Sequence, residues 1–89
     1  MTRKARIAEA LTEALRPVRL DIVDESDRHA GHSGARPGGE THYRLHIVSS
    51  AFVDKSRVER HRMVNAPLAA EFASGLHALA IAAAAPDEA

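Results

Sequence analysis

The hydrophobic pattern of this chain changes its period at Pro17, and that change constrains the fold more than any other feature. Apolar residues before Pro17 recur at the three- and four-residue spacing of an amphipathic helix: Ile7, Ala10, Leu11, Ala14 and Leu15. Proline cannot continue a helix, because it has no amide hydrogen to donate. After Pro17, apolar residues take every second position from 18 to 22, which is the period of a half-buried strand. We therefore expect a helix over 2–15 and a strand that ends at the polar cluster 24–26.

The same alternation returns in the middle of the chain. Tyr43, Leu45 and Ile47 are apolar and most of their neighbours are polar, so we expect a second strand over 42–48. Between the two strands, residues 27–39 contain most of the chain's five glycines, a proline and no large apolar side chain. Nothing there offsets the entropic cost of ordering the backbone. We therefore predict a flexible loop over 27–39 that carries His29 and His32.

Residues 56–59 have the signature of a helix start. Ser56 and Glu59 match the S-x-x-E capping box, in which each side chain accepts a hydrogen bond from the other residue's amide. The main helix is expected to begin at Ser56 and to end at Gly75. Pro67 lies inside it and removes one internal hydrogen bond, so we expect a kink near Met63.

The last apolar stretch, residues 76–82, alternates weakly and predicts a third strand. The alanine-rich residues 83–89 that follow are expected to fray. The order helix, strand, strand, helix, strand predicts an α+β fold: a small three-stranded mixed sheet with helices packed on one face. A chain of 89 residues has room for one such unit, so we assign 1–89 to a single domain.

Charge and cysteine content limit the possible functions. The chain has 12 basic residues, 12 acidic residues and no cysteine. Its neutral net charge favours no class of charged partner, and it forms neither disulfides nor a self-contained cysteine-ligated cluster. Imidazole is therefore its best ligand for iron or zinc. No apolar run reaches the ~18 residues that a membrane helix needs, so we expect a soluble, cytoplasmic protein with no membrane partner.

Three histidines can be interpreted from their positions in the sequence. His42 and His46 are four residues apart on the predicted second strand, where this spacing separates them by ~13 Å. One ion cannot bridge that distance, so we interpret both as strand-face residues that are hydrogen-bonded or solvated. His61 lies between two arginines near a helix start, where positive charge opposes the helix dipole. It is either a packed or capping residue or part of a site for an anionic partner.

Four phrases in a fixed order resemble the BolA family: Val23-Asp24-Glu25-Ser26 before a histidine-bearing loop, ETHYRLHIVSS at 40–50, SRVERHRMVN at 56–65 and LHALAI at 76–81. The resemblance extends from about Ile7 to Ile81. It implies the BolA fold, which is similar to the type II KH arrangement. The chain departs from the family pattern at Pro67, where relatives usually have a good helix former.

The resemblance implies a heterodimer with a monothiol glutaredoxin, in which the two proteins share one [2Fe-2S] cluster for iron–sulfur trafficking or iron sensing. The glutaredoxin would supply its own cysteine and glutathione. His77, in the His-Ala-Leu phrase, matches the family's iron ligand, and His29 matches the loop ligand, which is histidine in one branch and cysteine in another. His32 is an alternative to His29; the spacing after 25–26 favours His29 without deciding between them. Mixed histidine and cysteine ligation is chemically sound, as it is in Rieske centres.

A DNA-binding transcriptional regulator is the alternative, and the family includes members described in this way. Basic side chains crowd the start of the main helix: Lys55, Arg57, Arg60 and Arg62. Free amides at a helix start also receive phosphates. However, Asp54 and Glu59 interrupt this patch, and the turn at 53–56 lacks the G-x-x-G with which a KH module clamps a nucleic-acid backbone. A solvated helix face is the remaining interpretation.

Asp24, Glu25 and Ser26 combine carboxylates with a hydroxyl, as a nucleophilic site would. No glycine elbow surrounds Ser26, and nothing in the sequence directs a histidine to it. We therefore expect no enzymatic activity. We interpret Asp24 and Ser26 as residues that end the first strand and pin the loop.

Overall fold

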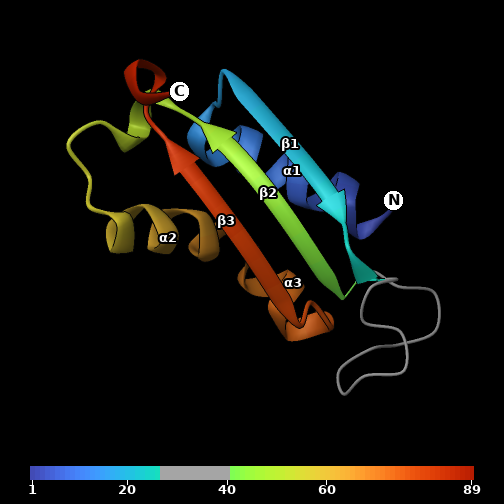
Figure 1. The fold of residues 1–89 in the computed structure, drawn as a ribbon. Coiled ribbons are helices and arrows are strands. Elements are labelled where there is room, and N and C mark those ends of the chain that lie inside the picture. The colour runs from blue at the N-terminus through green and yellow to red at the C-terminus, as the bar shows by residue number, and fades with distance from the viewer. Residues whose placement is uncertain (27–40) are drawn as a thin grey trace.

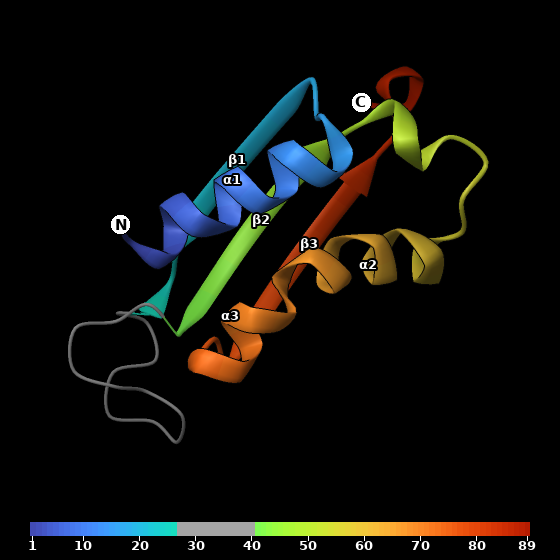
Figure 2. The ribbon, with the colours of Figure 1, turned by 180° about the vertical axis from the view of Figure 1, so that it is seen from behind.

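A computed structural model describes residues 1–26 and 41–89, so the predicted loop over 27–39 lies outside the described residues. The elements are α1 (Arg3–Leu15), β1 (Arg19–Asp24), β2 (His42–Val48), a 3₁₀ turn (Ser50–Phe52), α2 (Arg57–Asn65), a 3₁₀ turn (Ala66–Leu68), α3 (Ala69–Ser74), β3 (Ala78–Ala84) and a last 3₁₀ turn (Pro86–Glu88). The α+β architecture predicted from the sequence is confirmed: a three-stranded sheet has its helices on one face, and no helix of the described residues covers the other face (Figures 1 and 2).

The first helix forms as its pattern predicts. The Thr2 hydroxyl accepts a hydrogen bond from the Ala5 amide at 3.1 Å and caps the helix start. Arg16 ends the helix in a left-handed conformation, and its amide donates to the Thr12 carbonyl. Ile7 and Leu11 are fully buried against the sheet side of the molecule, so the four-residue spacing gives α1 its packing face.

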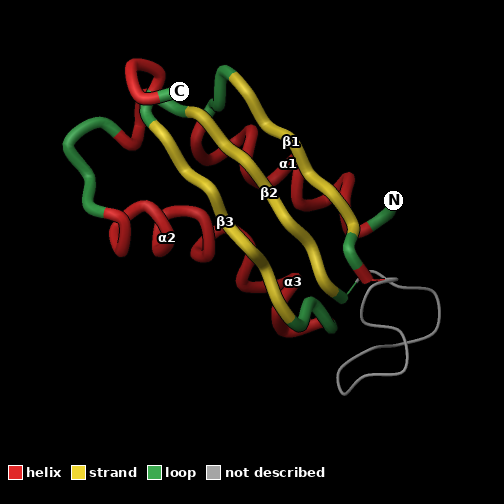
Figure 3. Tube along the Cα trace, viewed as in Figure 1, coloured by secondary structure: helices red, strands yellow, loops and turns green. Residues whose placement is uncertain are grey.

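The sheet has strand order β1-β2-β3 (Figure 3). β1 is antiparallel and β3 is parallel to the central β2, as the arrows in Figure 1 show. Leu45 at the centre pairs in register with Ile22 of β1 and Ile81 of β3. Because side chains alternate along a strand, Tyr43, Leu45 and Ile47 all point toward the helices, and all three are buried. His42 and His46 lie on the opposite face, where His42 is buried and His46 is half-buried.

The main helix is broken rather than kinked, which corrects the prediction of a bend near Met63. α2 ends at Asn65, a 3₁₀ turn carries Pro67, and α3 begins at Ala69. Pro67 has no amide hydrogen to donate, so the ladder of α-helical hydrogen bonds is interrupted there, although Ala66 before it keeps α-helical dihedral angles. The predicted capping box is confirmed, since the Ser56 amide donates to Glu59 at 3.2 Å and the Glu59 amide donates to Ser56 at 3.1 Å.

The carboxyl-terminal residues are ordered into the fold, which corrects the expectation that 83–89 fray. The third strand runs from Ala78 to Ala84, two residues later than predicted. Ala85 is buried, and its amide donates to the Glu88 carboxylate at 2.7 Å. Arg60 of α2 then pairs with that carboxylate at 2.5 Å. These contacts hold the chain end against α2. Across the described residues, no helix is both long and apolar enough to cross a bilayer.

Candidate metal site and basic segment

His77 lies at the end of the sheet where β2 and β3 begin side by side. The Thr41 carbonyl accepts hydrogen bonds from the His77 amide at 2.7 Å and the Ala78 amide at 3.1 Å. β3 begins at Ala78, and residues 76 and 77 connect it to the turn at Gly75. Gly75 has φ of 130°, a value that a residue with a Cβ rarely adopts. The His77 backbone is therefore fixed, while its side chain is exposed.

The imidazole of His42 lies beside that of His77. The two ring centroids are 5.2 Å apart and the ring planes are tilted by 48°. His42 is 7% exposed, and its Nδ1 is 2.8 Å from the Thr41 hydroxyl oxygen. The prediction that His42 is a hydrogen-bonded strand residue is confirmed, but spacing along the sequence did not reveal its contact with His77. His46 has different surroundings, because its Nδ1 is 4.0 Å from Asp21 across to β1.

Ser26 connects the end of β1 to the start of β2, beside His42. Its hydroxyl oxygen accepts hydrogen bonds from the Thr41 amide at 2.9 Å and the His42 amide at 3.1 Å. The Asp24 carboxylate accepts from the Ser26 amide at 2.8 Å. The prediction that the first strand ends at Asp24 and Ser26 is confirmed, whereas the loop that they were expected to pin lies outside the described residues. Both described ends of segment 27–40 therefore meet beside His77.

The described part of the site offers imidazole and hydroxyl groups, and the sequence has no cysteine. Within 1–26 and 41–89, no group of three or more histidine, aspartate or glutamate side chains is arranged to hold a metal ion. His29 and His32, the candidate loop ligands, lie outside the described residues. A structural zinc site takes four ligands, so His42 and His77 amount to a partial ligand set.

The four basic residues predicted to bind nucleic acid do not share one environment. Lys55, Arg57 and Arg62 are exposed. Arg60 is turned toward the protein: it donates to the Lys55 carbonyl at 2.9 Å, to Ala83 at 3.4 Å and to both carboxylate oxygens of Glu88. The pairing raises the pKa of Arg60 and lowers the pKa of the Glu88 carboxyl to about 2. Arg60 is thus committed to an internal partner.

The basic segment, defined as residues 55–62, forms one wall of a cavity of about 500 Å³. The opposite wall is the free edge of β3. The cavity is lined by His46, Lys55, Arg57, Arg60, His61, Ile81, Ala82, Ala83, Ala84 and Glu88. His61 is half-buried there, which agrees with its interpretation as a packed residue and also leaves it facing a space beside exposed cations. The Glu59 carboxylate offsets part of the positive charge of these cations. Hydrogen bonds from Ser56, with the nearby Lys55 and Arg62, lower the pKa of Glu59 and so favour its charged form.

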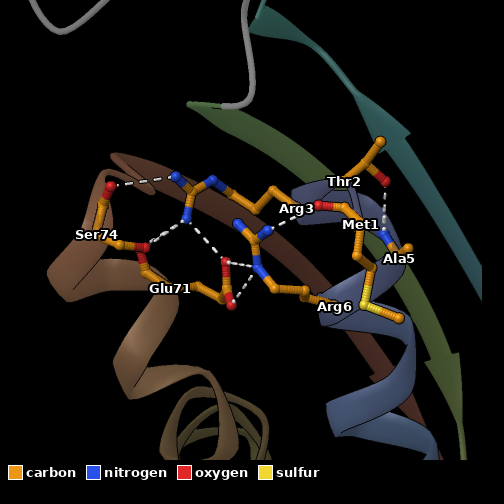
Figure 4. A network of polar contacts seen from close by, with 7 residues as sticks. All are labelled: Met1, Thr2, Arg3, Ala5, Arg6, Glu71 and Ser74. Carbon is orange, nitrogen blue, oxygen red and sulfur yellow. Dashed lines mark hydrogen bonds and ion pairs between the residues drawn. The ribbon is translucent and has the colours of Figure 1, made fainter.

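An ion-pair cluster behind the sheet, formed by Arg3, Arg6, Glu71 and Ser74, was not predicted (Figure 4). Arg3 Nη1 donates to the Glu71 carboxylate at 2.8 Å and to the Ser74 hydroxyl at 2.9 Å, and Arg6 Nε donates to Glu71 at 3.0 Å. Glu71 belongs to α3, which is followed by Gly75 and His77. The ion pairs therefore hold the segment before His77 against α1. The spacing of Arg3, Ile7 and Leu11, four residues each, is the sequence signal that places Arg3 on the buried side of α1.

Comparison with known proteins agrees with this architecture. A family model described as BolA-like protein matches residues 11–88. A Sinorhizobium protein called "Uncharacterized protein in cobS 5'region" is 51% identical over 83 residues, which is 92% of this chain and 89% of that protein. The DNA-binding transcriptional regulator BolA of Escherichia coli is 40% identical over 78 residues, or 88% of this chain and 70% of that protein.

The fold comparison points the same way. The solved BolA domain of SufE1 from Arabidopsis thaliana superposes with a TM-score of 0.90 at 48% identity, and the match covers 100% of this chain and 98% of that domain. The full Arabidopsis SufE-like protein 1 is longer: at 48% identity the match takes in 98% of this chain but 24% of that protein.

Proposed function

Because the chain belongs to the BolA-like protein family, we propose that it is an accessory protein that holds a [2Fe-2S] cluster jointly with a monothiol glutaredoxin. One observation carries this proposal. His77 presents an exposed imidazole on a backbone that Thr41 pins, at the place where both described ends of segment 27–40 meet. An exposed imidazole on a fixed backbone suits a ligand that must reach a metal centre shared with another protein.

The ligand chemistry of the chain fits a shared cluster. The chain has no thiolate to offer, so the glutaredoxin cysteine and glutathione would bind one iron while imidazoles of this chain bind the other. Histidine ligation raises the reduction potential of a [2Fe-2S] cluster relative to an all-cysteine site. Such a cluster suits transfer to an acceptor or sensing of iron, and neither role requires this chain to be an enzyme.

The second imidazole would come from the segment outside the described residues. A chain spans at most about 3.3–3.6 Å per residue, and His29 is three residues from Ser26, whereas His32 is six. The shorter separation from Ser26 along the sequence supports His29 over His32 as the second ligand.

The test is the spectrum of the mixed complex. The protein is mixed with a cluster-loaded monothiol glutaredoxin, and visible absorption and circular dichroism are recorded for wild type, His77→Ala, and His46→Ala as a matched control. We expect His77→Ala to change or abolish the spectrum of the mixed cluster while its own thermal unfolding stays near that of wild type, and His46→Ala to leave the spectrum unchanged. An unchanged spectrum and cluster lifetime in His77→Ala would remove His77 as a ligand.

DNA binding is the second candidate, and two observations favour it. The E. coli relative carries the name of a DNA-binding transcriptional regulator, and Lys55, Arg57 and Arg62 are exposed beside a cavity at the sheet edge. Phosphate contacts make affinity depend steeply on salt, so a gel shift at several salt concentrations tests this function. A cytoplasmic location stays a prediction from the sequence.

A further inference from the structure

We propose that the free edge of β3 is a docking site for an extended, acidic segment of a partner protein. The segment adds to the three-stranded sheet as a fourth strand and directs its acidic side chains at the basic segment. The site lies in the second half of β3, along residues 81–84, whereas His77 precedes the first residue of that strand. Recognition of this kind, β-strand addition, uses neither the metal ligands nor DNA.

β3 is an edge strand with open backbone groups on its outer side. It pairs with β2 on one side only (Figure 1). The Ala78 amide donates to Thr41 at 3.1 Å and the Ala84 carbonyl accepts from Ser49 at 3.0 Å, so the even-numbered residues of β3 face β2. The residues between them turn both backbone groups to the other side. Ile81 therefore directs its N–H and C=O outward, and no hydrogen bond of the described residues reaches these two groups.

The two edges of the sheet differ in how they are protected. On β1, Arg19 and Asp21 form an ion pair at 2.7 Å, and charged side chains of this kind keep an edge from pairing with other strands. β3 has the uncharged sequence ALAIAAA. On its outer side, Arg60 donates to the Ala83 carbonyl at 3.4 Å and covers the edge there. The N–H and C=O of Ile81 and the N–H of Ala83 remain open to an added strand.

The cavity of about 500 Å³ follows this edge and has the size of a ligand site. Residues 81–84 form one wall and the basic segment forms the other. Lys55, Arg57 and Arg60 bring positive charge to the cavity, and the acidic lining residue, Glu88, is already paired with Arg60. Lys55 and Arg57 form no ion pair with any described residue. An occupant with acidic side chains therefore complements the charge of the cavity.

The experiment titrates the isotope-labelled full chain, without a histidine tag, with a synthetic peptide and follows the backbone amides by nuclear magnetic resonance. The peptide alternates glutamate and valine over about six residues, a usual strand length, and both its ends are blocked. We expect the amide signals of Ile81 and Ala83 to move most, because they gain hydrogen bonds, and those of Ala80 and Ala82, which face β2, to change little. A shift pattern without this alternation would contradict strand addition.

Methylated peptides separate backbone pairing from attraction between charges. One peptide is methylated on the amide nitrogens of its glutamates and another on those of its valines. Alternate residues of a strand face its neighbour. One peptide should therefore lose its bonds to β3 and bind at least about tenfold more weakly, while the other stays within about threefold of the unmodified peptide. Equal affinities of the two methylated peptides would overturn the proposal.

Two charge variants of α2 test the contribution of the basic segment. Arg57→Glu should weaken binding of the glutamate peptide about fivefold, because Arg57 lines the cavity. A glutamate at a helix start is favoured by the helix dipole, so this variant should fold. Arg62→Glu is the matched control, since Arg62 is exposed on the same helix outside the cavity lining, and it should change the affinity less than about twofold. An equal effect of the two variants would mean general attraction to the helix and would overturn docking in the cavity.

Two other occupants of the edge would give different results. If a short DNA duplex moves the Ile81 and Ala83 signals and the peptide does not, the cavity belongs to nucleic acid. If raising the protein concentration alone moves these signals, a second copy of this chain occupies the edge. Either result would overturn the peptide as the occupant. Glutaredoxin and metal are absent from these titrations, so their outcome is independent of the cluster experiment.

Discussion

Ser26 shows how much of the candidate site depends on one small side chain. Its hydroxyl oxygen accepts two backbone hydrogen bonds, from Thr41 and His42, and the side chain is 6% exposed. Those two residues hold His77 in turn through the Thr41 carbonyl and the His42 ring. At the residue scale, the backbone beside His77 is thus positioned through the Ser26 hydroxyl.

Replacing Ser26 with Ala should lower the free energy of unfolding by about 1–3 kcal/mol, because two buried amides lose their acceptor. The cluster lifetime in the glutaredoxin complex should shorten as well, since Thr41 is no longer held. Chemical denaturation and the decay of visible absorbance measure the two effects. Ser50→Ala, at an exposed position, is the control and should stay within about 0.5 kcal/mol of wild type. Wild-type stability in Ser26→Ala would show that the amides find other partners.

At the scale of elements, two ion-pair groups fasten the broken main helix to the rest of the fold. The Arg3, Arg6, Glu71 and Ser74 cluster joins α3 to α1 (Figure 4), and Arg60 with Glu88 joins α2 to the chain end. Because the helix is interrupted at Pro67, each of its two parts has its own ion pair to another element.

Replacing Glu71 with Gln should destabilise the protein by about 2–4 kcal/mol at pH 7, because Arg3 and Arg6 lose a charged partner in a largely buried cluster. Hydrogen bonds and charge from Arg6, with Arg3 adding to them, lower the pKa of Glu71 below its ordinary value of 4.5. A lowered folded-state pKa means that the carboxylate stabilises fully above the ordinary value and loses this effect as pH falls through the lowered pKa.

The difference in unfolding free energy between wild type and Glu71→Gln should therefore be constant near neutrality and shrink as the pH falls below about 4.5. Urea titrations at several pH values measure it. Glu13→Gln, at an exposed position of α1, is the matched control and should show no such difference. A gap that stays constant down to pH 3 would mean that Glu71 acts through packing rather than through its charge.

The pairing of Arg60 with Glu88 sets a quantitative expectation for DNA binding. Contacts from Lys55, Arg57 and Arg62 to phosphates predict a slope of about −3 for log affinity against log salt. Arg57→Ala/Arg62→Ala should reduce the slope by about two, and Arg60→Ala should change it little. Glu88→Gln frees Arg60 and should steepen the slope by about one. A slope near zero in wild type would leave the basic segment as a solvated helix face.

At the scale of the whole molecule, the central strand is the element on which the described fold depends most. β2 pairs with both other strands, and its Leu45 is 1% exposed in a core to which α1, α2 and β1 also contribute. Leu45→Ala should cost about 2–5 kcal/mol, because it leaves a cavity at the centre of the core. A small domain usually unfolds in one transition, so helix and sheet signals should be lost together.

Far-ultraviolet circular dichroism reports on the helices, and the near-ultraviolet signal of Tyr43 reports on the sheet, because Tyr43 lies on β2. Their midpoints should coincide in wild type and move together in Leu45→Ala. Val18→Ala, at a position that is 72% exposed, is the control and should shift neither. Separate midpoints for the two signals would mean that the sheet and its helices are not one cooperative unit.

The sequence by itself determined the features that depend on neighbours within a few residues. The period of apolar positions predicted α1, β1 and β2 closely, the capping box predicted the start of α2, and Gly75 predicted the end of α3, because each rests on local backbone geometry. Of the candidate site, His77 was identified by resemblance, and the roles of Asp24 and Ser26 by their place at a strand end.

Only the tertiary structure decided which distant side chains meet. Arg3 bonds to Glu71, which is 68 positions away, and Arg60 to Glu88, which is 28 positions away. Both pairs depend on how α1, the broken helix and the chain end pack, and no local pattern specifies that packing. The contact of His42 with His77 arises in the same way: the parallel pairing of β2 with β3 places Ala78 beside His42, and strand register is set by the whole buried face of a sheet rather than by either strand alone.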